Sequence, residues 1–388
     1  MKTVSIWLWT AAAFFAFFVF GFSDNLKGAI LPALLQDLRI DYTIGSSILL
    51  GLYIGFMAAT LTTGLIADAL GKRTVLLIAG GSLALGAGGF SSFSTPFLLG
   101  LSMFVLGYGL GALELSCNAI IVELHPMDKG RYLSLMSVMH GMGSMTAPFF
   151  AGLLLNAGSS WRTIYRLDFL LIGILLATAM LNRYPSIPSA ISDKIDFRRL
   201  GQMAFTPRMV WLYIAIVAYV AAEIGIASWL VEYLQKIRAQ DVKTSTSALS
   251  LYFGLMVVGR FAGSFVIERL GYIKSILIAM LGASACIALG LSGPAFALTT
   301  SGFFLAIVFP AITATATDGL IENTNTVLGL LFTFAGLGGM LGPWLVGFAS
   351  DYLGIDQGYW LNLGFALLTA ISAIFLLQHS RKKNALNA

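Results

Sequence analysis

Long apolar stretches, separated by short polar segments, follow one another along the whole chain of 388 residues. A helix needs about 20 predominantly apolar residues to cross a bilayer, and twelve of the stretches reach that length. They lie at about 5–34, 44–68, 74–93, 96–122, 131–156, 162–182, 209–236, 246–269, 274–293, 295–319, 325–350 and 358–379. The pattern predicts an all-α membrane protein with twelve transmembrane helices.

The two halves of the chain repeat each other. Residues 52–55 match residues 251–254 at an offset of 199. Further pairs at offsets of 199 or 195 are Asp24 and Glu223, Gln36 and Gln235, Gly143 and Gly338, and Pro148 and Pro343. We therefore predict two pseudo-symmetric six-helix bundles, at 1–182 and 209–388, joined by a cytoplasmic linker at 183–208 and followed by a short cytoplasmic tail. Internal repeats of this kind are typical of transporters whose substrate lies at the bilayer midplane between the halves.

The composition excludes a soluble globular protein. Hydrophobic residues make up 58% of the chain and charged residues only 11%, whereas globular proteins carry about 25% charged residues. The first stretch is too long for a cleavable signal peptide and has no small-residue cleavage site before Asp24, so we expect it to be retained as a spanning helix. Cys117 and Cys286 lie inside predicted helices. No nucleophile–base set, metal-ligand spacing or cofactor motif is visible, so we predict neither an enzyme nor a cofactor or metal site.

Lysine and arginine residues are distributed unequally between the two sets of loops. One set carries fifteen of them and the other six, while Lys27 and Arg260 lie inside helices. Because basic loops stay on the cytoplasmic side, both termini are predicted to be cytoplasmic, and the protein is predicted to lie in the cytoplasmic (inner) membrane. The net charge of +5 follows from this asymmetry, so it does not indicate nucleic-acid binding. The lipid bilayer and a small solute are the expected partners of a monomer.

Three acidic residues, Asp24, Glu114 and Glu223, interrupt apolar stretches near their centres. An ionisable side chain at bilayer depth costs several kcal/mol and usually faces a water-filled cavity or a partner. Such residues add nothing to helix packing. They indicate solute translocation.

The end of the second stretch, residues 64–73, resembles the G-x-x-x-D-x-x-G-[RK]-[RK] signature of the major facilitator superfamily. Gly71 permits a sharp turn there. In that superfamily the cluster latches the two halves together on the cytoplasmic side, and the second half carries an echo of it. The resemblance implies a cytoplasmic gate formed by Gly64, Asp68, Gly71, Lys72, Arg73, Glu268 and Arg269.

The fourth stretch, residues 107–118, is similar to the G-x-G-x-x-x-L-E-x-x-x-N pattern of the fucose:galactose:proton symporter family. Residues 25–32, 219–229 and 309–312 resemble the same family. The resemblance implies that Glu114 serves both proton coupling and sugar recognition, and Asn118 lies one helical turn away on the same face. We assign substrate contacts to Glu114, Asn118, Glu223, Trp229, Asn25 and Gln36, and proton coupling to Asp24, Glu114, Lys27 and His140.

The chain departs from that family at Gly28, where the family places an essential aspartate. Asp24, one turn earlier on roughly the same face, either replaces it or pairs with Lys27 within the same helix. In the second case the charge of Asp24 is neutralised by its own helix.

Three more of these residues allow a second interpretation. Glu114 could pair with a fixed cation, Lys27 or Arg260. Trp229 could anchor the helix at the membrane interface. His140 could be a hydrogen-bonded core residue instead of a titrating one.

These residues together predict a secondary transporter. We expect it to move a hexose-like sugar or a related small polar solute by alternating access, with H⁺ as the coupling ion and Na⁺ as the alternative. The competing function is export of drugs or lipid-like amphiphiles by proton antiport. The 14 Met and 28 Phe residues are compatible with the aromatic, Met-rich cavity of such an exporter.

Overall fold

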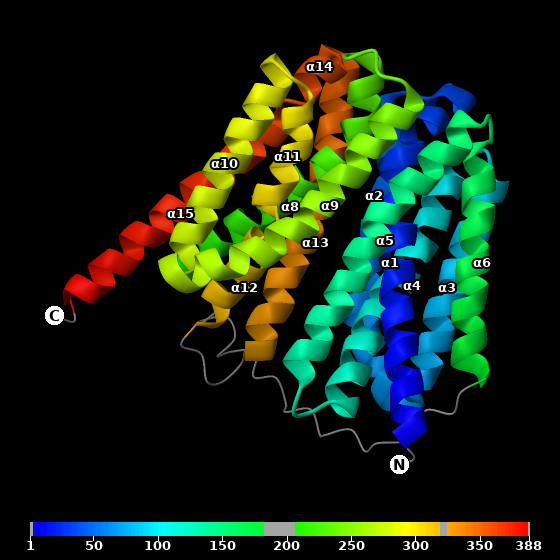
Figure 1. Cartoon of the computed structure of the whole chain (residues 1–388), viewed down its shortest axis with the longest axis horizontal. Helices are drawn as coiled ribbons and strands as arrows, with labels where there is room; N and C mark the ends of the chain where they lie inside the picture. The colour runs from blue at the N-terminus through cyan, green and yellow to red at the C-terminus, as the bar shows by residue number, and fades with distance from the viewer. Residues whose placement is uncertain (1–2, 182–205, 319–323, 387–388) are drawn as a thin grey trace. The chain divides into compact units, whose positions relative to one another are not determined.

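The computed structural model describes residues 3–181, 206–318 and 324–386, and within them every regular element is a helix (Figure 1). The first half contains α1 (Thr3–Leu38), α2 (Tyr42–Leu70), α3 (Lys72–Ser92), α4 (Pro96–Leu124), α5 (Lys129–Asn156) and α6 (Trp161–Leu181). The second half contains α8 (Pro207–Lys236), α9 (Val242–Leu270), α10 (Tyr272–Ser292), α11 (Phe296–Leu305), α12 (Val308–Thr317), α13 (Thr324–Leu353), α14 (Ile355–Gly358) and α15 (Leu361–Leu386). Most of the predicted linker, at 182–205, lies outside the described residues.

The twelve-helix prediction is confirmed. The tenth predicted stretch is a helix interrupted after Leu305, which gives α11 and α12, and the single turn α14 precedes the last long helix α15. In the described part of the chain, eleven candidate spans are long and apolar enough to cross a membrane, with α11 and α12 counted as one.

The described residues form two compact units. The first holds residues 3–181 together with Leu230–Ser250, and the second holds 206–229 together with 251–386. The boundaries therefore fall inside α8 and α9. Within the first unit, the Tyr42 hydroxyl donates a hydrogen bond of 3.1 Å to the Glu232 carboxylate. A Cβ on Gly152 of α5 would lie 1.9 Å from the hydroxyl oxygen of Thr246 on α9, so α5 and α9 touch there.

The sequence repeat is visible in the helix crossings of each unit. In the first unit α1 packs on α5, where a Cβ on Gly143 would lie 2.1 Å from the Phe18 carbonyl oxygen. In the second unit a Cβ on Gly338 would lie 2.4 Å from the Val217 carbonyl oxygen, between α13 and α8. The glycines are 195 residues apart and their partners 199 apart, which are the offsets of the repeat. Glycine permits this close approach because no side chain separates the two backbones.

Single glycines join two pairs of consecutive helices. Gly71 lies between α2 and α3 with φ of 83°, and Gly271 lies between α9 and α10 with φ of 76°. Positive φ strains every residue with a Cβ, so glycine is the residue that fits both turns. The predicted sharp turn at Gly71 is confirmed, and the second half has the same turn.

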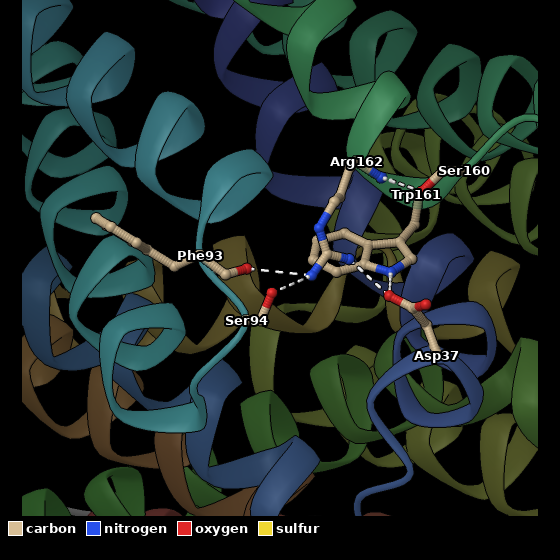
Figure 2. Close-up of polar contacts among 6 residues, drawn as sticks. All are labelled: Asp37, Phe93, Ser94, Ser160, Trp161 and Arg162. Atoms are coloured by element: carbon tan, nitrogen blue, oxygen red, sulfur yellow. Dashed lines mark hydrogen bonds and ion pairs between the residues drawn. The ribbon is translucent and has the colours of Figure 1, made fainter.

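A polar cluster joins the ends of α1, α3 and α6 in the first unit (Figure 2). The Asp37 carboxylate accepts hydrogen bonds from the Trp161 indole at 3.0 Å and from the Arg162 guanidinium at 2.6 Å. The same guanidinium donates to the Phe93 carbonyl oxygen and the Ser94 hydroxyl, and it stacks 4.1 Å from the Trp161 ring. One arginine thus holds three helix ends together.

Candidate functional site

In the first unit, the acidic residue on α1 is paired within its own helix. The Lys27 ammonium donates to the Asp24 carboxylate at 2.5 Å and to the Asp24 carbonyl oxygen at 2.7 Å. It also lies 5.4 Å from the centre of the Tyr53 ring on α2, in cation–π geometry. The side chains are 4% exposed for Lys27 and 17% for Asp24. Of the two arrangements that the sequence allows for Asp24, the internal ion pair with Lys27 is therefore present.

Glu114 projects from α4, which packs against α1. Its side chain is half-buried, and the Asp24 carboxylate lies close enough to act on it electrostatically. Within the described residues Glu114 makes no hydrogen bond or ion pair. Lys27, one of the cations considered as its fixed partner, bonds Asp24 instead. Asn118 is half-buried one turn further along α4, so the two side chains share a helix face.

The remaining predicted residues of α1 and α5 have different surroundings. The Asn25 amide donates to the Gly21 carbonyl oxygen and to the Ser144 hydroxyl on α5, and Asn25 is buried. His140 is half-buried with its ring 4.7 Å from that of Phe20. Gln36 is exposed near the end of α1. Asn25 thus contributes to the α1–α5 contact, whichever solute the protein carries.

In the second unit, Glu223 of α8 lies beside tyrosines. Its carboxylate hydrogen-bonds the Tyr219 hydroxyl one turn earlier, and Arg260 of α9 acts electrostatically on the same tyrosine. The Tyr252 hydroxyl donates to the Glu223 carbonyl oxygen at 3.2 Å. Trp229 is fully buried, and its indole donates to the Pro343 carbonyl oxygen at 2.9 Å. Its ring is therefore a packing element of the second unit in this structure.

The predicted gate residues follow the ends of α2 and α9. Gly64 has open space around it, and Glu268 and Arg269 are exposed. The Arg73 guanidinium donates to the Met180 carbonyl oxygen of α6 at 2.7 Å. The side chains of Asp68 and Lys72 lie outside what the structure describes.

Sequence reasoning missed two buried carboxyl groups of the described residues, Glu232 of α8, which accepts from Tyr42, and Asp168 of α6. Asp168 is fully buried and accepts a hydrogen bond of 2.9 Å from the Ser23 hydroxyl of α1. The signal was available, because Asp168 interrupts an apolar stretch as Asp24 and Glu114 do. The structure brings Asp24, Lys27, Glu114 and Asp168 together in the first unit, and it places Glu223 and Trp229 in the second.

Two six-helix repeats that carry carboxyl groups within their membrane spans define a polytopic solute transporter. Residues 13–343 match the Major Facilitator Superfamily, and the chain belongs to that family. The chain is therefore a multi-pass membrane transporter for a small-molecule substrate, and not an enzyme.

Several known proteins are similar to this chain over most of their length. A glucose/galactose transporter of Brucella abortus is 24% identical over 366 residues, which cover 88% of each chain. The L-fucose-proton symporter of Escherichia coli is 23% identical over 415 residues, covering 96% of this chain and 92% of the symporter. The crystal structure of the nucleoside transporter NupG superimposes with a TM-score of 0.78 at 14% identity, over 97% of this chain and 99% of that one. The last similarity confirms the fold alone.

Proposed function

We propose that this protein carries a hexose-like sugar across the cytoplasmic membrane by alternating access, in symport with a proton. The observation that carries the proposal is Glu114, a half-buried carboxyl group that makes no ion pair within the described residues. Such a group can both accept a proton and bind a sugar hydroxyl. The names of the Brucella and Escherichia relatives support a sugar as the substrate and, for the second, a proton as the coupling ion.

Asp24 is the second carboxyl group of the proposed coupling site. It acts electrostatically on Glu114, so the two carboxyl groups form one coupling site in this proposal. The Lys27 ammonium bonds Asp24, which leaves Glu114, without an ion pair in the described residues, as the proposed group that loads and unloads the proton. Under this scheme Asn118 supplies an amide to the sugar from the same face of α4.

The cytoplasmic gate and the orientation belong to the same proposal. The excess of lysine and arginine in one set of loops supports cytoplasmic termini in the inner membrane. With this orientation the turns at Gly71 and Gly271 lie on the cytoplasmic side. Asp68, at the end of α2, would latch the halves when the cytoplasmic side is closed. We expect the monomer to be the transporting unit.

Uptake into proteoliposomes tests the proposal. Purified protein is assayed with radiolabelled glucose, galactose, fucose and a nucleoside, under an imposed proton gradient and separately under a sodium gradient. We expect a hexose to accumulate with the proton gradient and not with the sodium gradient. Accumulation under the sodium gradient would identify Na⁺ as the coupling ion instead of H⁺. Accumulation of the nucleoside alone would identify nucleosides, and not hexoses, as the substrate class.

Export is the competing function, and the same vesicles test it. With the gradient reversed, a proton antiporter would extrude a fluorescent amphiphile, whereas a sugar symporter would not. Extrusion of the amphiphile without uptake of any hexose would overturn the proposal.

A further inference from the structure

The carboxyl group of Asp168 lies in an uncharged environment. Its side chain is fully buried, and only one of its oxygens has a partner, the Ser23 hydroxyl at 2.9 Å. The other oxygen makes no hydrogen bond within the described residues, and neither does the fully buried Tyr165 hydroxyl one turn earlier on α6. A single hydroxyl donor does not offset the cost of burying a carboxylate, which is several kcal/mol for an unpaired ion.

No cation in the described part of the chain pairs with Asp168. The helices packed against α6 are α1, α3 and α5. The titratable groups that they and α6 itself present are Asp24, Lys27 and Asp37 on α1, Arg73 on α3, Lys129, Arg131, Tyr132 and His140 on α5, and Arg162, Tyr165 and Arg166 on α6. Lys27 bonds Asp24, Arg162 bonds Asp37 and Arg73 bonds a carbonyl oxygen, while Arg166 is exposed.

The second repeat forms the corresponding helix contact without a carboxyl group. The buried positions of α6 and α15 follow the same spacing at an offset of 201: Trp161, Tyr165, Asp168, Ile172 and Leu175 correspond to Asn362, Ala366, Thr369, Ala373 and Leu376. Asp168 thus corresponds to Thr369, whose hydroxyl bonds the Phe365 carbonyl oxygen of its own helix. Ser23 corresponds to Ala222 at the offset of 199. The packing of this position therefore does not require an acid.

We propose that Asp168 is a proton-binding site of the transporter, separate from Asp24 and Glu114, and that it holds its proton while Ser23 of α1 packs against it. The bound proton converts a buried anion into a neutral acid, whose carbonyl oxygen accepts from Ser23. Ser23 and Asp24 are neighbours on α1, so a movement of that helix changes the surroundings of both carboxyl groups. The proposal does not depend on which solute is carried.

Infrared spectroscopy of the purified full-length protein in lipid nanodiscs tests the proposal without a transport assay. A protonated carboxyl group gives a C=O stretching band, apart from the amide bands, that a carboxylate lacks. We expect the wild-type spectrum at pH 7 to contain such a band that is lost in Asp168→Asn. The exposed Asp241, changed in the same way in Asp241→Asn, is the matched control and should leave the band unchanged. Identical carboxyl bands in wild type and Asp168→Asn would overturn the proposal.

A second variant covers the case in which Asp168→Asn does not fold. Ser23→Ala removes the hydrogen bond to the carbonyl oxygen, so the band of the protonated acid should move to higher frequency while the band persists. A band that does not move would assign it to another carboxyl group and contradict the proposal. If Asp168 were instead an anion held by Ser23, the variant would strand the charge, and a large drop in melting temperature with no shifted band would be seen.

Discussion

Asp24 and Glu223 occupy equivalent positions in the two repeats, yet their surroundings differ. The first is bound by Lys27 one turn away, at 2.5 Å, while the repeat places Ile226 at the equivalent position of the second half. A tyrosine is common to both, since Tyr53 and Tyr252 are 199 residues apart and each contacts the acidic turn of its own unit.

This comparison separates what the repeat keeps from what each half adds. Both halves keep an acid and a tyrosine at the crossing of their first two helices. The first half adds a cation, Lys27, which bonds Asp24, and a further carboxyl group, Glu114, on α4. The second half adds a phenol, Tyr219, which hydrogen-bonds Glu223. The first unit therefore adds charged groups to this crossing, whereas the second adds a hydroxyl group.

The largest expected effect follows from removing the carboxyl group that only the first half adds. Glu114→Gln should abolish concentrative uptake and leave the protein folded, because an amide cannot exchange a proton. Proteoliposome assays measure the uptake, and thermal melts show whether the variant is folded. Glu123→Gln, the same substitution at the end of the same helix, serves as the control. Gradient-driven accumulation by Glu114→Gln at the wild-type level would contradict the role of Glu114.

The ion pair that distinguishes Asp24 from Glu223 should have the next largest effect. Asp24→Asn and Lys27→Met should each cost about 3–5 kcal/mol of stability, because each leaves the other charge buried without its partner. The double variant should recover most of that loss, since the two residues are in contact. In Glu223→Gln the amide oxygen can still accept from the Tyr219 hydroxyl, so its melting temperature should fall less. Equal losses for Asp24→Asn and Glu223→Gln would remove the distinction between the halves.

The helix crossings should respond alike in both halves. Gly143→Ala and Gly338→Ala would each place a Cβ within 2.5 Å of a backbone oxygen on the facing helix. Such overpacking costs about 1–3 kcal/mol. Gly81→Ala and Gly173→Ala are the controls, because nothing lies within 4 Å of a Cβ at either position. Melting temperatures of the four variants give the comparison, and a loss confined to one half would show that the repeat does not extend to the energetics of packing.

The smallest expected effect concerns the segment between α4 and α5 in the first half. His125 stacks on Tyr132 at 3.6 Å and hydrogen-bonds Thr10 at 2.7 Å. Desolvation lowers the pKa of His125, and the nearby Asp128 partly opposes this shift. A lowered pKa favours the neutral ring in the folded state, so its stabilising contribution is present above the unfolded pKa of about 6.5 and is lost as the pH falls further.

Thermal melts between about pH 7.5 and pH 5 test this sign. We expect His125→Gln to lose less melting temperature on acidification than the wild type. Asp128→Asn should lower the pKa of His125 further, and so steepen the loss. Parallel pH profiles of the melting temperature for wild type and His125→Gln would mean that His125 does not contribute to the pH dependence of stability.

The sequence predicted the features that follow from spacing along the chain. Hydrophobic length gave the twelve helices, and the repeat offsets identified Gly143 and Gly338, whose crossings the structure then placed at equivalent points. What lies opposite a residue cannot be read from its own helix. The bond from Trp229 to the Pro343 carbonyl oxygen and the placement of Ser23 against Asp168 depend on the packing between helices. The interruption of the tenth stretch after Leu305 fits Pro310, which has no backbone N–H to bond the Ala306 carbonyl oxygen four residues earlier.

The one-residue turns at Gly71 and Gly271 have a consequence for membrane insertion. Consecutive Cα atoms lie about 3.8 Å apart, so the end of α2 and the start of α3 must lie at nearly the same depth in the bilayer. A helix of 21 residues such as α3 is about 32 Å long, close to the hydrocarbon thickness, and cannot slide without exposing apolar surface. Each glycine therefore fixes the depth in the bilayer of one helix relative to the next, and each half of the protein contains one such helical hairpin.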